Sequence, residues 1–309
     1  MVAGLLDGPR ARGAFLLRSS MDPPWALSVQ DEAPLTVVAV IRGHAVLTLG
    51  GGQPTRLGPG DLAVVRGPGH YVIGDAEGTA PQAVIGPDQR CTAVDGSEVS
   101  MTGQGIRTWG NSADGATVLL TGTYPSHGEV GARLLKALPA LLVIPAPSWD
   151  NPLPDYLAQE VSRDDPGQGA VLDRLLDVLL VAALRWWFDR PEAQPPGWYA
   201  AHGDPVIGPA LRLLQHQPGD PWTVGSLARA VGVSRAVLAR RFSDLVGEPP
   251  MTFLTGWRLD LAADLLAEPG VTLTAVARQV GYGSPFALSN AFKRERGIAP
   301  THYRDRLRA

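Results

Sequence analysis

Short apolar runs, rich in β-branched residues, characterise roughly the first 150 residues of the chain. The clearest are residues 35–41, 45–49 and 61–65. Clusters of glycine and proline separate these runs, and such clusters are typical of tight turns between strands. Several short runs at this spacing predict an all-β sandwich or barrel. Further strands are expected near residues 83–85 and 117–122.

The hydrophobic period changes to that of a helix beyond Pro152. After a polar helix comes a longer one, in which apolar residues recur at positions i, i+3, i+4, i+7 and i+8 and so share one broad face. That face packs either on the β domain or on its own copy in a second subunit. The residues that form it are Val171, Leu172, Leu175, Leu176, Leu179, Leu180, Ala183 and Leu184.

A proline-rich stretch precedes the last third of the chain and indicates a linker. Beyond it the pattern is helical, with no convincing strand. The fold class is therefore α+β. We expect a β-barrel domain at residues 1–150, connecting or dimerisation helices at 151–190, the linker at 191–204 and an all-α domain at 205–309.

Composition is that of a folded protein with about two domains, because 45% of the 309 residues are hydrophobic and 18% are charged. The single cysteine, Cys91, excludes an intramolecular disulfide framework and a thiolate zinc cage, and fits a reducing compartment. The N-terminus has no long apolar run of the signal-peptide kind. The longest apolar stretch, residues 178–188, contains Arg185 and is too short to cross a bilayer. We therefore expect a cytoplasmic protein with no membrane contact.

Charge is distributed unequally along the chain, although the net charge is only −3. Residues 1–204 carry 14 basic and 22 acidic side chains, a net of −8, whereas residues 205–309 carry 13 basic and 8 acidic ones, a net of +5. An acidic part joined to a basic part is expected when only one of them meets phosphates. A chance distribution of surface charge is the alternative.

An internal repeat occupies the basic part, where residues 227–242 resemble residues 276–292. Agreement at so many spaced positions indicates that one structural unit occurs twice. With one extra residue in the second turn, the matching pairs are Ala228 and Ala277, Arg229 and Arg278, Val231 and Val280, Gly232 and Gly281, Ser234 and Ser284, Leu238 and Leu288, Phe242 and Phe292, Gly247 and Gly297, and Pro250 and Pro300.

The repeated residues are those expected to end one helix and to start the next. A glycine tolerates the left-handed conformation that ends the first helix, at Gly232 and Gly281. A serine then caps the second helix, at Ser234 and Ser284, and Pro285 takes the favoured first helical position. Two helices joined by such a turn form a helix-turn-helix, whose second helix enters the major groove of DNA.

Cations lie on or beside the free face of both second helices, as expected for a surface that binds phosphates. Residues 251–267 form a helix between the two units whose apolar side chains would set their spacing. The cations are Arg235, Arg240 and Arg241 in the first unit and Lys293, Arg294 and Arg296 in the second.

The segment from about residue 209 to residue 304 resembles the DNA-binding domain of the AraC family of transcription regulators. The rest of the chain is similar to one branch of that family, in which a cupin-type β-barrel and connecting helices precede the DNA-binding domain. The matching residues are Leu227, Ala228, Gly232, Ser234, Leu238, Arg240, Phe242, Gly247, Pro250, Phe253, Leu254, Arg258, Leu259, Ala262, Leu265, Leu266, Val276, Ala277, Val280, Gly281, Tyr282, Ser284, Phe292, Lys293, Gly297, Pro300, Tyr303 and Arg304.

The resemblance implies which side chains face the bases. In the first unit these are Ala236, Ala239 and Arg240, and in the second Phe286, Ala287, Ser289 and Asn290. Arg240 could bind a guanine edge through its two-pronged guanidinium, or contact a phosphate instead. Asn290 stands where the family most often has arginine, and because asparagine pairs well with adenine we expect the second unit to recognise an A·T pair there.

Residues 60–70 resemble the second cupin motif, in which a histidine, here His70, points into the barrel. The first motif, with its paired histidines and glutamate, is absent, and only His44 lies in the matching hairpin. A metal held by His70 with His44 or Cys91 is therefore the less favoured interpretation, and no metal or cofactor is expected. A barrel without metal can still hold a small molecule. The candidate wall residues are Trp25, Arg42, His70, Tyr71 and Trp109.

These features predict a regulator, an activator or a repressor, that binds double-stranded DNA and is controlled by a small-molecule effector. A homodimer and RNA polymerase are further candidate partners, and no catalytic residue is expected. One alternative is a cupin enzyme, such as a dioxygenase or isomerase, fused to helices, against which the missing metal ligands argue. Another is a protein-interaction adaptor, against which the net charge of +5 and the cations beside both second helices argue.

Overall fold

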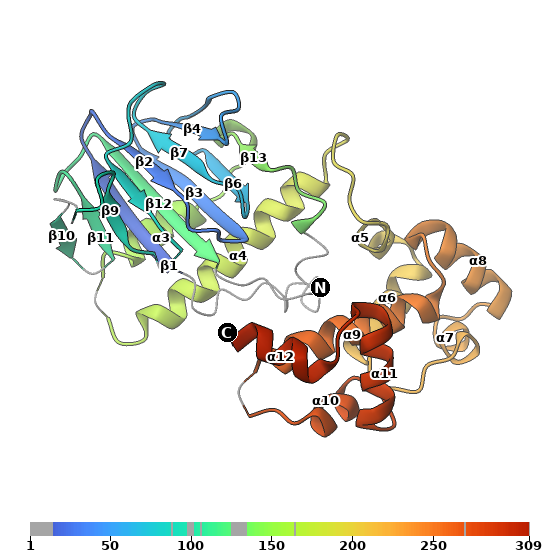
Figure 1. The fold of residues 1–309 in the computed structure, drawn as a ribbon. Helices are drawn as coiled ribbons and strands as arrows, with labels where there is room; N and C mark the ends of the chain where they lie inside the picture. The colour runs from blue at the N-terminus through green and yellow to red at the C-terminus, as the bar shows by residue number, and fades with distance from the viewer. Residues whose placement is uncertain are drawn as a thin grey trace. The chain divides into compact units, whose positions relative to one another are not determined.

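The computed structural model describes residues 15–87, 89–97, 102–105, 107–124, 135–163, 165–268 and 270–308. These residues fall into two compact units. Among the described residues, the first contains those within 15–124 and 138–193, and the second contains residues 135–137 and those within 194–308. Figure 1 shows strands and two covering helices in the first unit and helices throughout the second. The α+β fold class is therefore as predicted.

Two sheets form the framework of the first unit. Their hydrogen-bonded strands are not closed into a single barrel in the described part of the chain. One sheet has the strand order β10 (Thr102–Gly105), β11 (Thr108–Gly110), β1 (Phe15–Met21), β12 (Thr117–Tyr124), β3 (Leu35–Arg42), β6 (Leu62–Arg66), β13 (Leu141–Ile144). The other has the order β5 (Thr55–Leu57), β4 (Ala45–Leu49), β7 (Tyr71–Gly74), β2 (Ala26–Val29), β8 (Ala83–Ile85), β9 (Cys91–Ala93).

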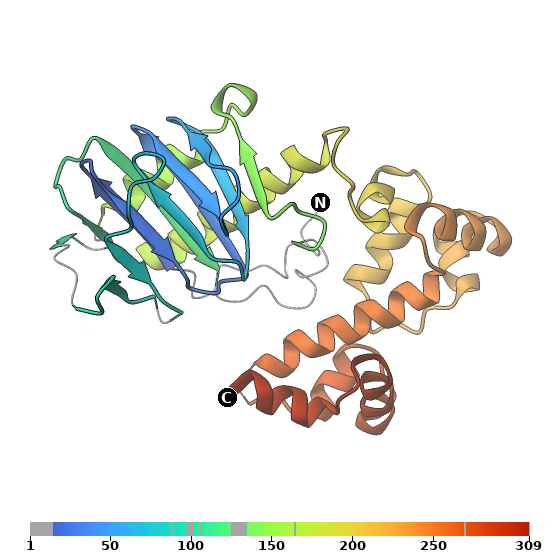
Figure 2. The same cartoon turned by 45° about the horizontal axis from the view of Figure 1, so that its top comes forward.

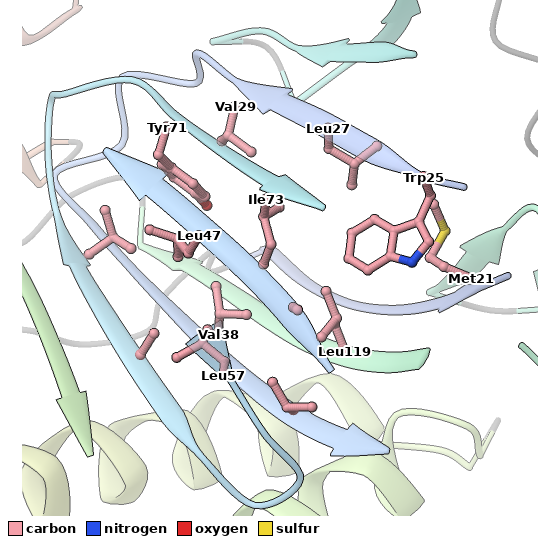
Figure 3. Packing of buried hydrophobic residues seen from close by; sticks show 14 of the residues in the cluster. Met21, Trp25, Leu27, Val29, Val38, Leu47, Leu57, Tyr71, Ile73 and Leu119 are labelled. Carbon is pink, nitrogen blue, oxygen red and sulfur yellow. The ribbon is translucent and has the colours of Figure 1, made fainter. Parts of the chain in front are cut away.

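The core of the first unit lies between these sheets. Side chains of β2 and β7, such as Leu27 and Ile73, point toward Val38 and Leu119 of the seven-stranded sheet (Figure 3). Trp25 is fully buried beside Met21 in the same cluster. Apolar area removed from water contributes roughly 25 cal/mol per Å², so this cluster is what holds the sheets face to face.

Helices α3 (Leu153–Glu160) and α4 (Gln168–Phe188) follow a short 3-10 turn at Ala146–Ser148 and pack on the seven-stranded sheet (Figures 1 and 2). The Tyr124 hydroxyl donates a hydrogen bond of 2.8 Å to the Leu176 carbonyl. A Cβ atom at Gly122 would lie 2.7 Å from Leu176 Cδ2, so α4 packs closely on β12 at this point. Six of the eight residues of the predicted apolar face are buried within the chain, whereas Val171 is exposed and Leu175 is half-buried, so the face packs mainly within the chain.

The second unit is helical. Its elements are α5 (Gly197–Ala200), a 3-10 turn at Ala201–Gly203, α6 (Ile207–His216), α7 (Val224–Ala230), α8 (Arg235–Val246), α9 (Pro250–Ala267), α10 (Leu273–Gln279), α11 (Pro285–Arg296) and α12 (Pro300–Arg308). Helix α9 belongs to both halves of the unit (Figure 2). Phe253 packs edge-on against Phe242 of α8 with ring centroids 5.8 Å apart, whereas Ala262 and Leu266 join the core around α10 and α11.

The segment expected to be a linker is in part ordered structure. Trp198 of α5 is buried, and a Cβ at Gly197 would lie 2.7 Å from the carbonyl oxygen of Val246, at the end of α8. The second unit therefore begins at Gln194 rather than at residue 205. The many prolines made this stretch resemble a linker, but α5 packs against α8 of the first helix-turn-helix.

Candidate functional site

The first helix-turn-helix consists of α7, a short turn and α8. Helix α7 ends at Ala230, two residues before Gly232, which has a φ of +75°, and the Val233 amide donates to the Ala228 carbonyl at 3.0 Å. That bond is the long-range bond of a Schellman motif. The Ser234 hydroxyl then accepts from the Val237 amide at 3.2 Å and caps α8. The predicted stop and cap are both confirmed.

The second helix-turn-helix, α10 and α11, repeats this geometry. Gly281 has a φ of +82°, and the Tyr282 amide donates to the Ala277 carbonyl at 2.8 Å. The Ser284 hydroxyl accepts from the Ala287 amide at 3.1 Å, and Pro285 is the first residue of α11. The two recognition helices, α8 and α11, thus start from the same local structure.

Two buried side chains anchor each recognition helix, and they are the residues that the repeat predicts. Leu238 and Phe242 of α8 are fully buried, as are Leu288 and Phe292 of α11. Phe292 also packs edge-on against Tyr303 of α12, with ring centroids 5.3 Å apart. The opposite face of each helix is therefore left at the surface.

The exposed face of α8 carries arginine at both ends of its first two turns. Arg235, Ala236 and Arg240 are exposed, and Ala239 is half-buried. Val237 is also exposed, by 39% of its surface. The sequence prediction did not include Val237 among the residues of the exposed face. Its position next to Leu238, near the start of the helix, is the signal that could have identified it.

Arg241 is held within the protein. Its Nε and Nη2 donate to Asp204 Oδ2 at 3.1 and 2.6 Å. The other oxygen of Asp204 accepts from the Val206 and Ile207 amides and so caps α6. Partial burial acts to raise the pKa of Asp204, but the bonds from Arg241 and the two amides lower it on balance. Arg241, predicted to contact DNA, therefore also fixes α8 to the start of α6.

The exposed face of α11 begins without charge. Phe286 is exposed by 74% of its surface, and Ala287 and Asn290 are also exposed, while Ser289 is half-buried. Its cations lie in the last turns, where Lys293 and Arg294 are exposed. Arg296 instead binds Asp260 of α9 at 2.5 Å. Its side chain and that of Asp260 are only 19% and 9% exposed, so this pair fixes α11 to α9.

Arg258 and Gly281 join the two helix-turn-helix units. Arg258 of α9 donates to the carbonyls of Pro218 and Asp220, in the loop before α7, at 2.7 and 2.8 Å. A Cβ at Gly281 would lie 2.8 Å from both Arg258 Nη2 and the Gly219 carbonyl oxygen. The turn of the second helix-turn-helix therefore contacts the loop that leads into the first helix-turn-helix. This contact sets the spacing of the two recognition helices.

A cavity of about 270 Å³ lies between the sheets of the first unit. Its walls include Leu17 and Trp109 from the seven-stranded sheet, and Leu27, Tyr71 and Ile73 from the other. Asp31, in the turn after β2, and Gln89, between β8 and β9, also line it. Gln89 Nε2 donates to Asp31 Oδ2 at 3.2 Å, which joins two turns that are distant in sequence.

The cavity contains two of the five predicted wall residues, Tyr71 and Trp109. Trp25 is buried in the core beside the cavity but does not line it. Arg42 lies at the surface and donates to Asp114 and to the Gly115 carbonyl. His70 is exposed, so the prediction that it points inward is wrong; it follows the turn made by Arg66, Gly67, Pro68 and Gly69 and lies outside the buried strand segments.

Burial raises the pKa of two titratable groups of the cavity wall, Tyr71 and Cys91. Desolvation, with a smaller contribution from the charge of Asp31, raises the pKa of Tyr71 far above its usual value. Burial also raises the pKa of the Cys91 thiol. Among the described residues there is no group of three or more histidine, cysteine, aspartate or glutamate side chains that could hold a metal ion. His44, like His70, is exposed.

No helix in the described ranges is both long enough and apolar enough to cross a membrane.

Comparison with known proteins covers both units. A family model described as "Cupin" matches residues 1–189, and one described as "Helix-turn-helix domain" matches residues 227–306. A Streptomyces lividans protein described as an AraC-like transcription regulator is 34% identical over 291 residues, which is 91% of this chain and 90% of that protein. The transcriptional regulator AlkR of Acinetobacter baylyi is 29% identical, again over 91% and 90% of the two chains.

Among solved structures, the DNA-binding domain of AdpA in complex with a target DNA is 32% identical, with a TM-score of 0.32. That comparison covers 34% of this chain and 95% of the AdpA domain. The full-length match to the Streptomyces protein, together with the cupin and helix-turn-helix matches, decides the family. The chain belongs to the AraC family of transcription regulators and carries a cupin domain before its DNA-binding domain.

Proposed function

We propose that this regulator recognises a specific DNA sequence through α8 and α11 together, and that a small molecule in the cavity between the sheets controls this recognition. The observation that carries the proposal is the pair of capped recognition helices, each anchored by a buried leucine and phenylalanine, on the shared helix α9. A helix held in this way presents its outer face to the major groove.

The first recognition helix is suited to guanine. Arg240 is exposed one turn beyond the exposed Ala236, and neither Ala236 nor Ala239 is large enough to keep the guanidinium from a base edge. A guanidinium can donate to both O6 and N7 of guanine, and such a pair discriminates against other bases by about 1–3 kcal/mol. Arg235, at the first position of the helix, is placed for a phosphate.

The second recognition helix is suited to A·T pairs. Phe286 and Asn290 are four residues apart, so they lie on one face of α11, one turn from each other. The Asn290 amide can donate to N7 and accept from N6 of adenine, while the exposed Phe286 ring can contact a thymine methyl group. Lys293 and Arg294 follow in the next turn and can contact phosphates.

A homodimer forms part of this proposal. Val171 and Val178 of α4 are 41% and 50% exposed, and seven residues place them on the same face two turns apart. A two-fold dimer would match two DNA half-sites. Val171→Asp with Val178→Asp should give a monomer in sedimentation velocity, whereas Val94→Asp, at another exposed valine of the first unit, should leave the dimer intact. A monomeric wild type would contradict this part.

The effector part rests on the cavity, which has the apolar walls and the few polar groups typical of small-molecule sites. Contact of the DNA-bound protein with RNA polymerase, as an activator or as an obstacle, completes the proposed regulation. Neither part assigns an enzymatic step to the chain.

The DNA part is tested by fluorescence anisotropy. The full chain is titrated against DNA from upstream of its own and neighbouring genes, with scrambled DNA of the same composition as the control, at two salt concentrations. We expect tighter binding to one upstream fragment and weaker binding to all fragments at higher salt, because phosphate contacts release counterions. Absence of binding to every fragment, even at low salt, would contradict the proposal.

A further inference from the structure

The described wall of the cavity between the sheets carries negative charge and no positive charge. Among the described residues that line it, Asp31 is the only one with a formal charge, and none carries a positive charge. The other polar side chains of the wall, among them the hydroxyls of Ser19, Thr121 and Thr123 and the amide of Gln89, are uncharged groups. Any ligand in this space therefore meets a negative potential that nothing in the described wall balances.

The hydrogen bonds of Asp31 leave its charge uncompensated. Oδ1 accepts from the Ala33 amide at 3.1 Å, and Oδ2 accepts from Gln89 Nε2 at 3.2 Å. Both donors are neutral, so they orient the carboxylate without cancelling its charge. The half-buried position of Asp31 makes that charge count for more than it would in water, because the interaction energy rises as the effective dielectric constant falls.

Two aromatic side chains line the same cavity from opposite sheets. Tyr71 comes from β7 of the six-stranded sheet and Trp109 from β11 of the seven-stranded sheet. Aromatic rings of this kind offer a large apolar surface that the ring or alkyl body of a small ligand can contact.

We propose that the cavity binds a small lipophilic cation, with its protonated amine at Asp31 and its apolar body between the sheets against Tyr71 and Trp109. This inference rests on the proposed effector function of the same cavity. A volume of about 270 Å³ is near the lower limit for ligand pockets, so the body is of the size of one aromatic ring or a short alkyl chain. The net charge of −8 on residues 1–204 favours the approach of cations.

Three probes that share one ring and differ in charge test the inference: 2-phenylethylamine, 2-phenylethanol and phenylacetate. Binding to the full chain is measured by isothermal titration and by the rise in melting temperature. We expect the amine to bind most tightly, the alcohol more weakly and phenylacetate not measurably. Asp31→Asn should weaken the amine by about tenfold or more, as expected for loss of a charged hydrogen bond, and should leave the alcohol within about twofold.

Glu32→Gln is the matched control, because Glu32 is an exposed carboxylate next to Asp31 that does not line the cavity. It should bind all three probes as the wild type does. Equal binding of amine and alcohol, unchanged in Asp31→Asn, would overturn the cationic ligand class, and so would absence of amine binding. If the amine binds in an Asp31-dependent way but leaves the affinity for DNA unchanged, the ligand class stands and the proposed effector control fails.

Discussion

The two helix-turn-helix units share their internal architecture and differ in what they expose. Both have the same Schellman stop, the same serine cap and the same buried leucine and phenylalanine. On the surface, α8 offers Arg235 and Arg240, whereas the first two turns of α11 offer Phe286 and Asn290. Under the proposed function, the same helix supports with different exposed side chains would let one chain recognise two unlike segments of DNA.

The units also differ in how their recognition helices are fixed. Arg241 of α8 binds Asp204 in a pair whose side chains are 43% and 14% exposed, and Arg296 of α11 binds Asp260 in a pair that is 19% and 9% exposed. A buried pair becomes costly when one partner is lost, because the other charge stays buried without compensation. The stability of the second helix-turn-helix should therefore depend more on its ion pair than the stability of the first helix-turn-helix does.

Loss of these ion pairs is expected to give the largest difference between the units. Arg296→Ala should lower the free energy of unfolding by about 3 kcal/mol, and Arg241→Ala by about 1 kcal/mol or less. Urea titration of the helical circular dichroism signal measures both in the full chain. Equal losses for the two variants would show that the described burial does not govern their energetics.

The two turn glycines sharpen the comparison at a smaller scale. Both have positive φ, but a Cβ at Gly232 meets no atom within 4 Å, whereas one at Gly281 would press on Arg258 and the Gly219 carbonyl. Gly232→Ala should cost about 1 kcal/mol from the left-handed backbone alone. Gly281→Ala should cost at least about 2 kcal/mol, since packing strain adds to the backbone term. The same urea titration applies, and a Gly232 variant as unstable as the Gly281 variant would refute this account.

In the proposed function, base recognition by the first helix-turn-helix depends on Arg240. Arg240→Ala should reduce the affinity for the preferred DNA by about 2 kcal/mol and leave the affinity for scrambled DNA nearly unchanged. Arg235→Ala is the matched control, since loss of a phosphate contact should weaken both DNAs alike. Anisotropy titrations give the affinities of both variants for both DNAs. If Arg240→Ala also weakened both DNAs to the same extent, the residue would be a phosphate contact, which is the alternative that the sequence leaves open.

The smallest expected effect concerns Phe286. Phe286→Ala should cost about 1 kcal/mol of affinity for the preferred DNA, because a contact with a thymine methyl group buries little more than one carbon. Replacing thymine by uracil in the A·T segment should cost the wild type a similar amount and the variant almost nothing. Anisotropy with the four combinations of protein and DNA measures this coupling. Additive losses would place the ring away from the methyl group.

The sequence predicted the helical domain, residues 205–309, in detail because the signals for its elements are local. A glycine stop, a serine cap and an i, i+4 leucine and phenylalanine act within one turn of the chain, so Gly232, Ser234, Leu238 and Phe242 could be placed without a structure. The ordered start of the domain could not, because α5 packs against the end of α8, about 50 residues later in the chain. Proline content alone predicted a linker there.

The cavity was only partly predictable for a similar reason. Tyr71 and Trp109 were among the candidate wall residues proposed after the cupin resemblance, but nothing local marks Asp31 or Gln89. Their contact joins turns 58 residues apart and depends on how the two sheets pack. His70 was misplaced because its motif was matched by resemblance, whereas the chain places the histidine in the exposed turn before β7.

Selection of binding sites from random DNA tests the central claim, unequal recognition by the two units, most directly. The full-length wild type, Arg240→Ala and Asn290→Ala are each used to select sequences, which are then compared base by base. We predict two unlike segments for the wild type, one containing guanine and one rich in A·T pairs. Arg240→Ala should lose preference only at the guanine, and Asn290→Ala only in the A·T segment. Two copies of one segment, or loss of the same positions in both variants, would contradict the account.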